Sequence, residues 1–174
     1  MINFIKEINE YAKVTIGLVI AEKVFSLIDK NDYGYNLGRE ALDNSWKWLE
    51  GEEIDADELC DYIGNIDGEE DISGIAYITK QIKYKHMWYV LYYAIAYTSW
   101  LAYINEDSCP PEELDNVSDD TLIYIIQNAI KTELFKIESI NRIKDYLLEN
   151  YPLSNMSKEK NISKKEIMKM LDDN

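Results

Sequence analysis

The sequence is poor in the residues that interrupt helices or that build disulfide frameworks. Its 174 residues include only three prolines and seven glycines, so few turns are available for a fold of many short strands, and we expect long helices. The two cysteines, Cys60 and Cys109, have neither metal-ligand nor oxidoreductase spacing, which suits reduced thiols. No basic segment followed by an apolar one opens the chain, so we expect no secretory signal and a cytoplasmic protein.

A single histidine, His86, excludes most catalytic and metal-binding arrangements. The sequence contains no His-Glu-x-x-His, no Glu-x-x-His pair and no glycine-rich phosphate loop. The alternating polar residues of 65–71 resemble a calcium-binding loop, but the positions that require glycine and a bidentate glutamate hold Glu70 and Ala76. We therefore expect no catalytic residue, no metal and no cofactor.

One stretch, 87–104, carries no charged side chain. A helix that is apolar on all sides is either buried in a bundle or embedded in a membrane, and this one would reach about 27 Å. A bilayer span keeps its tyrosines mostly at the two ends, whereas here they occur along the whole length. These tyrosines are Tyr89, Tyr92, Tyr93, Tyr97 and Tyr103. We therefore predict a buried central helix and no membrane span.

Apolar residues recur at three- and four-residue steps through most of the remaining chain. This periodicity predicts helices over about 3–29, 37–50, 55–66, 118–130 and 137–150. It also predicts helical structure over 75–84, either as a separate helix or as the lead-in to the central helix. Ser163 and Glu166 form a capping-box pattern that can begin one more short helix. We predict an all-α, single-domain bundle of about seven helices around the Tyr-rich central helix. Residues 1–152 form this domain, and residues 153–174 form a polar tail with the short terminal helix.

Charge is the most informative feature of the composition. Eighteen basic against thirty-three acidic residues give a net charge of −15, which argues against binding to nucleic acid or to an anionic membrane. Residues 31–75 hold fourteen acids against Arg39 and Lys47, and residues 106–120 hold seven acids and no base. The plainer interpretation is a solvated face. A run of one sign also repels itself, however, and a basic protein partner would relieve that repulsion.

Several stretches resemble one family of proteins. They are GREALDNSWKWLE (38–50), DELCDYIGNID (57–67), AIAYTSWLAY (94–103), AEKVFSLI (21–28) and PPEELDNVSDDTLIYIIQNA (110–129). In the order in which they occur along the chain, these stretches are similar to the sixth numbered family of immunity proteins in bacterial polymorphic toxin systems, over about residues 1–151. The resemblance implies an all-α cytosolic protein, encoded beside a delivered toxin, that binds the toxin domain and blocks it without enzymatic activity. The matching positions are Ala41, Leu42, Trp46, Trp48, Leu49, Ala94, Tyr97 and Trp100.

Two of these positions cannot both face one core. Trp46 and Trp48 lie about 200° apart around a helix. We assign Trp46, with Trp100, to the core and predict that Trp48 is an exposed anchor for a partner. The candidate partner-binding residues are Trp48, Glu52, Glu53, Asp55, Asp57, Glu58, Asp61, Asp67, Glu69, Glu70 and Asp71.

The leading hypothesis is an immunity protein that occludes its cognate toxin stoichiometrically through this acidic surface. The toxin would be a nuclease or another protein with a basic cleft. The alternative is an acidic DNA mimic that regulates a nucleic-acid-binding protein. A further alternative is a small all-α enzyme with paired carboxylates, but the periodicity places no inward-facing acid pair for it. The last alternative is a membrane-associated bundle.

Overall fold

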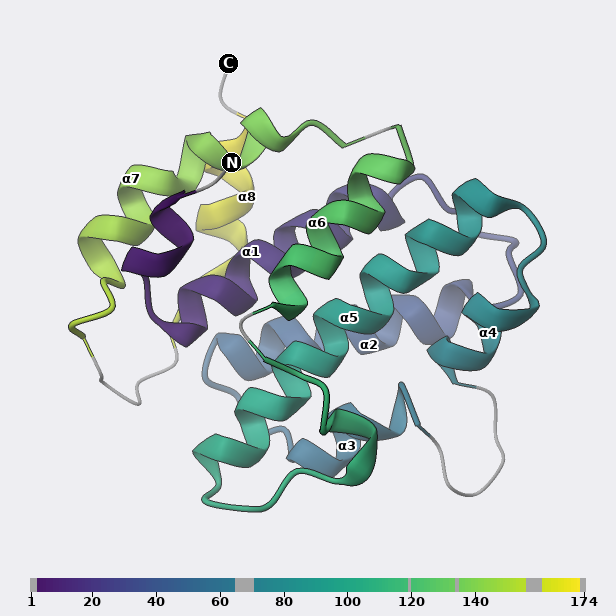
Figure 1. Ribbon diagram of the computed structural model, residues 1–174, viewed down its shortest axis with the longest axis horizontal. Helices are drawn as coiled ribbons and strands as arrows, with labels where there is room; N and C mark the ends of the chain where they lie inside the picture. The colour runs from purple at the N-terminus through teal and green to yellow at the C-terminus, as the bar shows by residue number, and fades with distance from the viewer. Residues whose placement is uncertain (1–2, 65–70, 119, 134, 156–160, 173–174) are drawn as a thin grey trace.

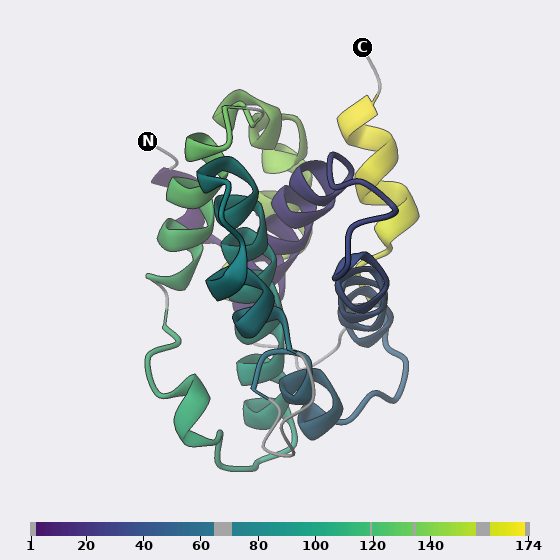
Figure 2. The ribbon, with the colours of Figure 1, turned by 90° about the vertical axis from the view of Figure 1, so that its right-hand side faces the viewer.

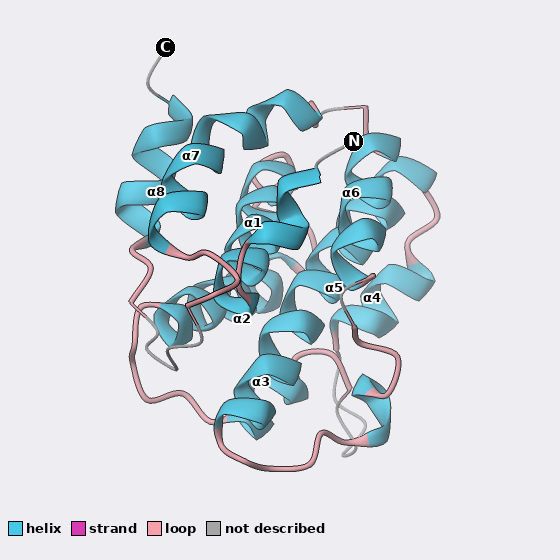
Figure 3. Ribbon diagram, turned by 60° about the vertical axis from the view of Figure 1, so that its left-hand side comes forward, coloured by secondary structure: helices cyan, strands magenta, loops and turns pink. Residues whose placement is uncertain are grey.

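The computed structural model describes residues 3–64, 71–118, 120–133, 135–155 and 161–172. These residues form eight α-helices and no strand, as Figure 3 shows. The α-helices are α1 (Glu10–Phe25), α2 (Tyr35–Leu49), α3 (Ala56–Asp61), α4 (Ile72–Ile78), α5 (Ile82–Asn105), α6 (Thr121–Lys131), α7 (Asn141–Asn150) and α8 (Lys164–Asp172). Three short 3-10 helices lie between them: η1 (Asn3–Glu7), η2 (Glu112–Leu114) and η3 (Ile137–Ile140). The prediction of an all-α bundle is confirmed.

Helix α5 is the centre of the bundle, as the uncharged stretch predicts. It packs against α1, α2, α3, α4 and α6, and Figure 1 shows it running between them. Its side chains are buried on several sides of the helix, from Met87 and Trp88 near its start to Tyr103 near its end. None of the described helices is both long and apolar enough to cross a membrane.

Two glycines bring α1 and α2 close to their neighbours. A Cβ atom on Gly17 of α1 would lie 3.1 Å from Ile125 Cδ1 of α6. A Cβ atom on Gly38 of α2 would lie 2.7 Å from Phe25 Cε2 of α1 and 2.9 Å from Leu91 Cδ2 of α5. The absent side chains therefore set how tightly α1, α2, α5 and α6 pack.

The first predicted helix is interrupted. Where periodicity predicts one helix over 3–29, η1 ends at Glu7 and α1 begins at Glu10. The side chain of Asn9 accepts a hydrogen bond from Ala12 N at 3.1 Å and caps α1, which turns the chain out of helical geometry. The main chain on either side is then free to pair with the segment after α7: Asn9 N donates to Tyr151 O at 2.9 Å.

The C-terminal helix α8 packs against α7, and its start lies against the end of α2. It begins at the capping box, where Glu166 N donates to Ser163 Oγ at 3.5 Å. Ile167 and Leu171 are buried, and Ile162 just before the helix donates its N–H to Leu49 O at 3.3 Å. In Figure 2 the lower end of α8 lies directly above α2. The end of α2 is therefore covered by the start of α8 as well as by its neighbours in the bundle.

Candidate partner-binding surface

The two acidic segments that flank α5 meet at one end of the molecule. Ala56 N, at the start of α3, donates to Glu106 Oε1 at 3.0 Å. The Tyr103 hydroxyl donates to Asp57 Oδ1. A Cβ atom on Gly64 would lie 3.0 Å from Glu113 Cγ. Figures 1 and 2 show α3 and the 106–118 segment together below α5. We call this surface the acidic end: the described acidic side chains of 50–64 and 106–120.

Four of the predicted residues are exposed at the acidic end and have no ion pair among the described residues. Glu52, Glu53, Asp55 and Asp61 are exposed. None of the ion pairs among the described residues includes any of these four carboxylates. Within the described part of the chain, their negative charge is therefore not balanced by a salt bridge.

Three other predicted acids are held by hydrogen bonds of the fold. Asp57 is exposed and accepts from Tyr103, and Glu58 is exposed and accepts from Asn44 Nδ2 at 2.9 Å. Asp71 is half-buried and caps α4, where Gly74 N donates to its Oδ1 at 2.7 Å. These bonds fix the positions of the carboxylates. The predicted positions Asp67, Glu69 and Glu70 lie outside the described residues.

Comparison with known proteins identifies the family. The model of the family "Immunity protein Imm6" matches residues 12–132, which include α1 except its first two residues, α2 to α6 and both acidic segments. The chain belongs to this family. No curated protein and no solved structure matches the chain. Immunity proteins act by binding and neutralising a cognate toxin, so the exposed surfaces of this immunity protein are candidate toxin contacts.

The prediction that Trp48 of the immunity protein is an exposed anchor is wrong. Trp48 is 0% exposed, and its ring centroid lies 6.1 Å from that of Tyr11 in α1. Trp46 is also buried, under Lys164 of α8, whose Nζ lies 5.9 Å from the Trp46 ring. The prediction assumed that α2 has one buried face. Since Lys164 at the start of α8 lies over Trp46 on a second face of α2, both indoles are enclosed although they point in nearly opposite directions.

Two tyrosines hold the acidic end in place. Tyr62 accepts a hydrogen bond from Asn44 Nδ2 at 2.9 Å and donates to Glu40 Oε1 at 3.3 Å. Burial and the charge of Glu40 raise the pKa of Tyr62 to about 12. Burial and the hydrogen bond to Asp57 likewise raise the pKa of Tyr103. Both hydroxyls therefore stay protonated near neutral pH and act as donors to carboxylates.

Among the described residues, the thiol of Cys60 and the ring of His86 are not placed in a metal-binding or nucleophilic arrangement. Burial raises the pKa of the Cys60 thiol, so the thiol stays protonated, whereas an attacking thiolate needs a lowered pKa. His86 Nδ1 lies 2.8 Å from Asn128 Oδ1 on α6. No three His, Cys, Asp or Glu side chains of the described residues are grouped to hold a metal ion. What the surface offers is fixed negative charge.

The sequence indicated the acids of 50–71 but not their neighbours. Glu106 and Glu113 belong to the acidic end because they contact α3 and Gly64, more than forty positions away in the chain. The seven acids of 106–120 are the sequence feature from which Glu106 and Glu113 could have been added to the candidate residues.

Proposed function

We propose that this immunity protein neutralises a toxin domain with a basic cleft, such as a nuclease, by covering that cleft with its acidic end. The observation that carries the proposal is the convergence of the two acidic segments on one surface, where exposed carboxylates such as Glu52, Glu53 and Asp61 lack an ion-pair partner in the described chain. A basic cleft that binds phosphates would supply the missing positive charge.

Electrostatics also favours this mode of action kinetically. The net charge of −15 steers a basic partner toward the protein and speeds association, above all at low salt. Rapid capture suits a protein that must silence a toxin before the toxin acts. Stoichiometric occlusion requires no reaction by the immunity protein, in keeping with the lack of a reactive site among the described residues.

The test compares two triple charge reversals. The first, Glu52→Lys with Glu53→Lys and Asp61→Lys, changes the acidic end without removing the hydrogen bonds of Asp57 and Glu58. The control, Glu138→Lys with Asp145→Lys and Glu149→Lys, makes the same charge change on exposed positions of η3 and α7. Both should unfold in urea like the wild type, because surface changes alter stability little.

The toxin domain encoded beside the gene is the binding partner in this test. The affinity of the acidic-end variant for the toxin domain should be lower than that of the wild type by a factor of more than about ten, and this variant should fail to protect a host that expresses the toxin domain. The control variant should still protect the host. Equal affinity of the two variants would place the interface elsewhere. Comparable binding to several unrelated basic proteins would favour the DNA-mimic alternative instead.

A further inference from the structure

A groove of about 410 Å³ opens beside the acidic end, between α5, η2 and the start of α6. Its aromatic walls are Tyr92 and Tyr93 of α5 and Tyr124 of α6. Glu113 of η2 and Asp120, the residue before α6, line it as well. We call it the tyrosine groove. Because Glu113 also touches Gly64, the groove is continuous with the acidic end.

The rings of the groove present faces to which a cation can bind. Tyr93 and Tyr124 are stacked, with ring centroids 5.7 Å apart and an interplanar angle of 30°. Tyr92 stands edge-on to Tyr93 at 5.2 Å. Tyr124 is 47% exposed, so a partner can reach it. The face of a tyrosine ring attracts ammonium and guanidinium groups.

A neighbouring part of the same aromatic row already holds a cation. Lys85 Nζ lies 5.8 Å from the ring centre of Tyr77 and 6.0 Å from that of Tyr89. Tyr89 in turn lies 6.5 Å from Tyr93. In the described part of the chain, no lysine or arginine lies over the rings of the groove itself. The groove therefore has the aromatic surface of a cation site without an internal cation.

The electrostatic field in the groove is negative. Glu113 and Asp120 are exposed, and none of the ion pairs among the described residues includes either carboxylate. Burial raises the pKa of Tyr92, and the charges of Asp71 and Glu113 raise it further. A positive group entering the groove would meet carboxylates at its rim and rings along its wall.

We propose that the tyrosine groove receives one arginine side chain of the toxin domain. The guanidinium stacks on Tyr124 and Tyr93 and donates hydrogen bonds to Glu113 or Asp120. Arginine fits better than lysine because its planar fork stacks on rings and binds carboxylates in pairs of hydrogen bonds. This inference rests on the proposed function and names one anchor point within the interface.

The test uses variants of Tyr124 that remove either the ring or only its hydroxyl. It also uses amide variants of Glu113 and Asp120 that remove the charge and keep the shape of the side chain. Tyr124→Leu should weaken binding of the toxin domain about 5- to 30-fold, while Tyr124→Phe, which keeps the ring, should stay within about twofold. Glu113→Gln with Asp120→Asn should weaken binding about tenfold and reduce its salt dependence. Urea unfolding of each variant checks that the fold is retained, as expected for exposed positions.

Arginines on the toxin domain complete the experiment. Each surface arginine is replaced in turn by alanine and by lysine and tested against wild type and Tyr124→Leu. At one arginine, replacement by alanine should weaken binding of the toxin domain to the wild-type immunity protein but should weaken binding to Tyr124→Leu little further. This non-additivity would show that the arginine and Tyr124 are coupled. If lysine at that position restores full affinity, the assignment to arginine is wrong.

The outcomes distinguish this inference from the function on which it rests. If the acidic-end triple variant loses binding but all groove variants bind like wild type, the groove inference is wrong and the proposed function stands. If the wild-type chain does not bind the toxin domain, both are wrong. If the wild type self-associates and Tyr124→Leu does so less, the groove belongs to a second copy of this chain, and the inference is overturned.

Discussion

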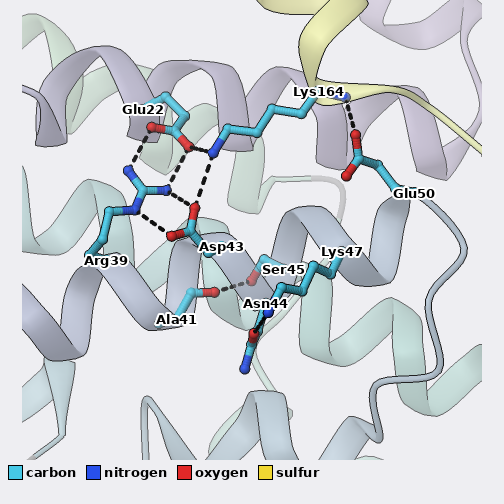
Figure 4. A network of polar contacts seen from close by, with 9 residues as sticks. All are labelled: Glu22, Arg39, Ala41, Asp43, Asn44, Ser45, Lys47, Glu50 and Lys164. Atoms are coloured by element: carbon cyan, nitrogen blue, oxygen red, sulfur yellow. Dashed lines mark hydrogen bonds and ion pairs between the residues drawn. The ribbon is translucent and has the colours of Figure 1, made fainter.

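Replacement of Arg39 by leucine should destabilise the protein through a buried carboxylate. Arg39 joins α2 to α1 by donating to both oxygens of Glu22, at 2.9 and 2.7 Å, and joins Asp43 at 3.0 and 2.7 Å. Lys164 Nζ of α8 contacts the same two acids, as Figure 4 shows. The Glu22 side chain is only 10% exposed, so it depends on these partners for its charge.

The magnitude follows from what remains after the change. Removal of one partner from a fully buried ion pair costs about 3–5 kcal/mol. Here Lys164 still contacts Glu22, and Asp43 is 44% exposed, so the electrostatic loss should be smaller. Arg39 also lies 5.6 Å from the Phe25 ring, a contact worth about 0.5–1 kcal/mol. We expect a loss of about 3 kcal/mol in the free energy of unfolding at pH 7.

The loss should depend on pH in a defined direction. Burial alone would raise the pKa values of Glu22 and Asp43, but the hydrogen bonds and charges of Arg39 and Lys164 outweigh it and lower both. In the unfolded chain these groups titrate near their ordinary values, about 4.3 and 3.9. The stabilisation is therefore complete above about pH 5 and is lost as the pH falls through the lower folded-state values.

Urea unfolding of wild type and Arg39→Leu at pH 7 and pH 3 measures this effect. The difference in the free energy of unfolding between wild type and Arg39→Leu reports on the ion pairs of Arg39. The general relief of self-repulsion at low pH affects both proteins and cancels in this difference. The double variant Glu22→Leu with Arg39→Leu should be more stable than Arg39→Leu at pH 7, because no buried carboxylate is left without its arginine. A difference that is equal at both pH values, or a double variant no more stable than the single, would refute this reasoning.

Two further predictions concern side chains whose burial differs sharply from that of a matched residue. Cys109 is exposed and should react with a thiol reagent in the native protein. Cys60 is 6% exposed and its pKa is raised by burial, so it should react only when the protein unfolds. Equal reaction rates of the two thiols in the native protein would contradict this. Ile167→Ala on α8 should lower stability by about 2–4 kcal/mol in thermal unfolding, because Ile167 is 0% exposed. Lys169→Ala, an exposed position on the same helix, should change stability by less than about 0.5 kcal/mol, and a similar loss in both would show that α8 does not pack on the bundle.

The elements that sequence predicts well are those whose environment is decided locally. The stretch 87–104 has no charge to place in water, so a chain of this size buries it whatever surrounds it. The break at Asn9 and the burial of Trp48 depend on contacts with distant residues. Asn9 bonds to Tyr151, and the enclosure of α2 requires Lys164 to lie against Asp43. Periodicity within one helix carries no information on such partners.

The same distinction applies to the acidic end. The sequence alone shows that residues 50–71 and 106–120 are rich in acidic residues. That the two segments form one surface follows from the packing of α3 on α5, whose C-terminal end brings Tyr103 to Asp57 and leads into the second segment. The tyrosine groove requires Tyr93 of α5 and Tyr124 of α6 to stack, a contact that no local pattern specifies.

The charges at the ends of α5 are opposite to those that would stabilise it. A helix favours acids at its N-terminus and bases at its C-terminus, by about 0.3–1 kcal/mol each. Helix α5 instead carries Lys83 and Lys85 in its first turn and is followed by Glu106 and Asp107. Glu106 is partly compensated because it accepts a hydrogen bond from the first turn of α3.

Asp107 adds a backbone cost at the same place. Its φ of 53° lies in the left-handed region, where a glycine would avoid a penalty of about 1–2 kcal/mol. An aspartate thus occupies a position where both helix electrostatics and backbone geometry would be better served by another residue. The helix-terminus charges of α5 do not favour acids at this end of the molecule, whereas the basic toxin cleft that we propose would favour them. Under that proposal the acids lie where the toxin binds, which is the reason to begin mutagenesis there.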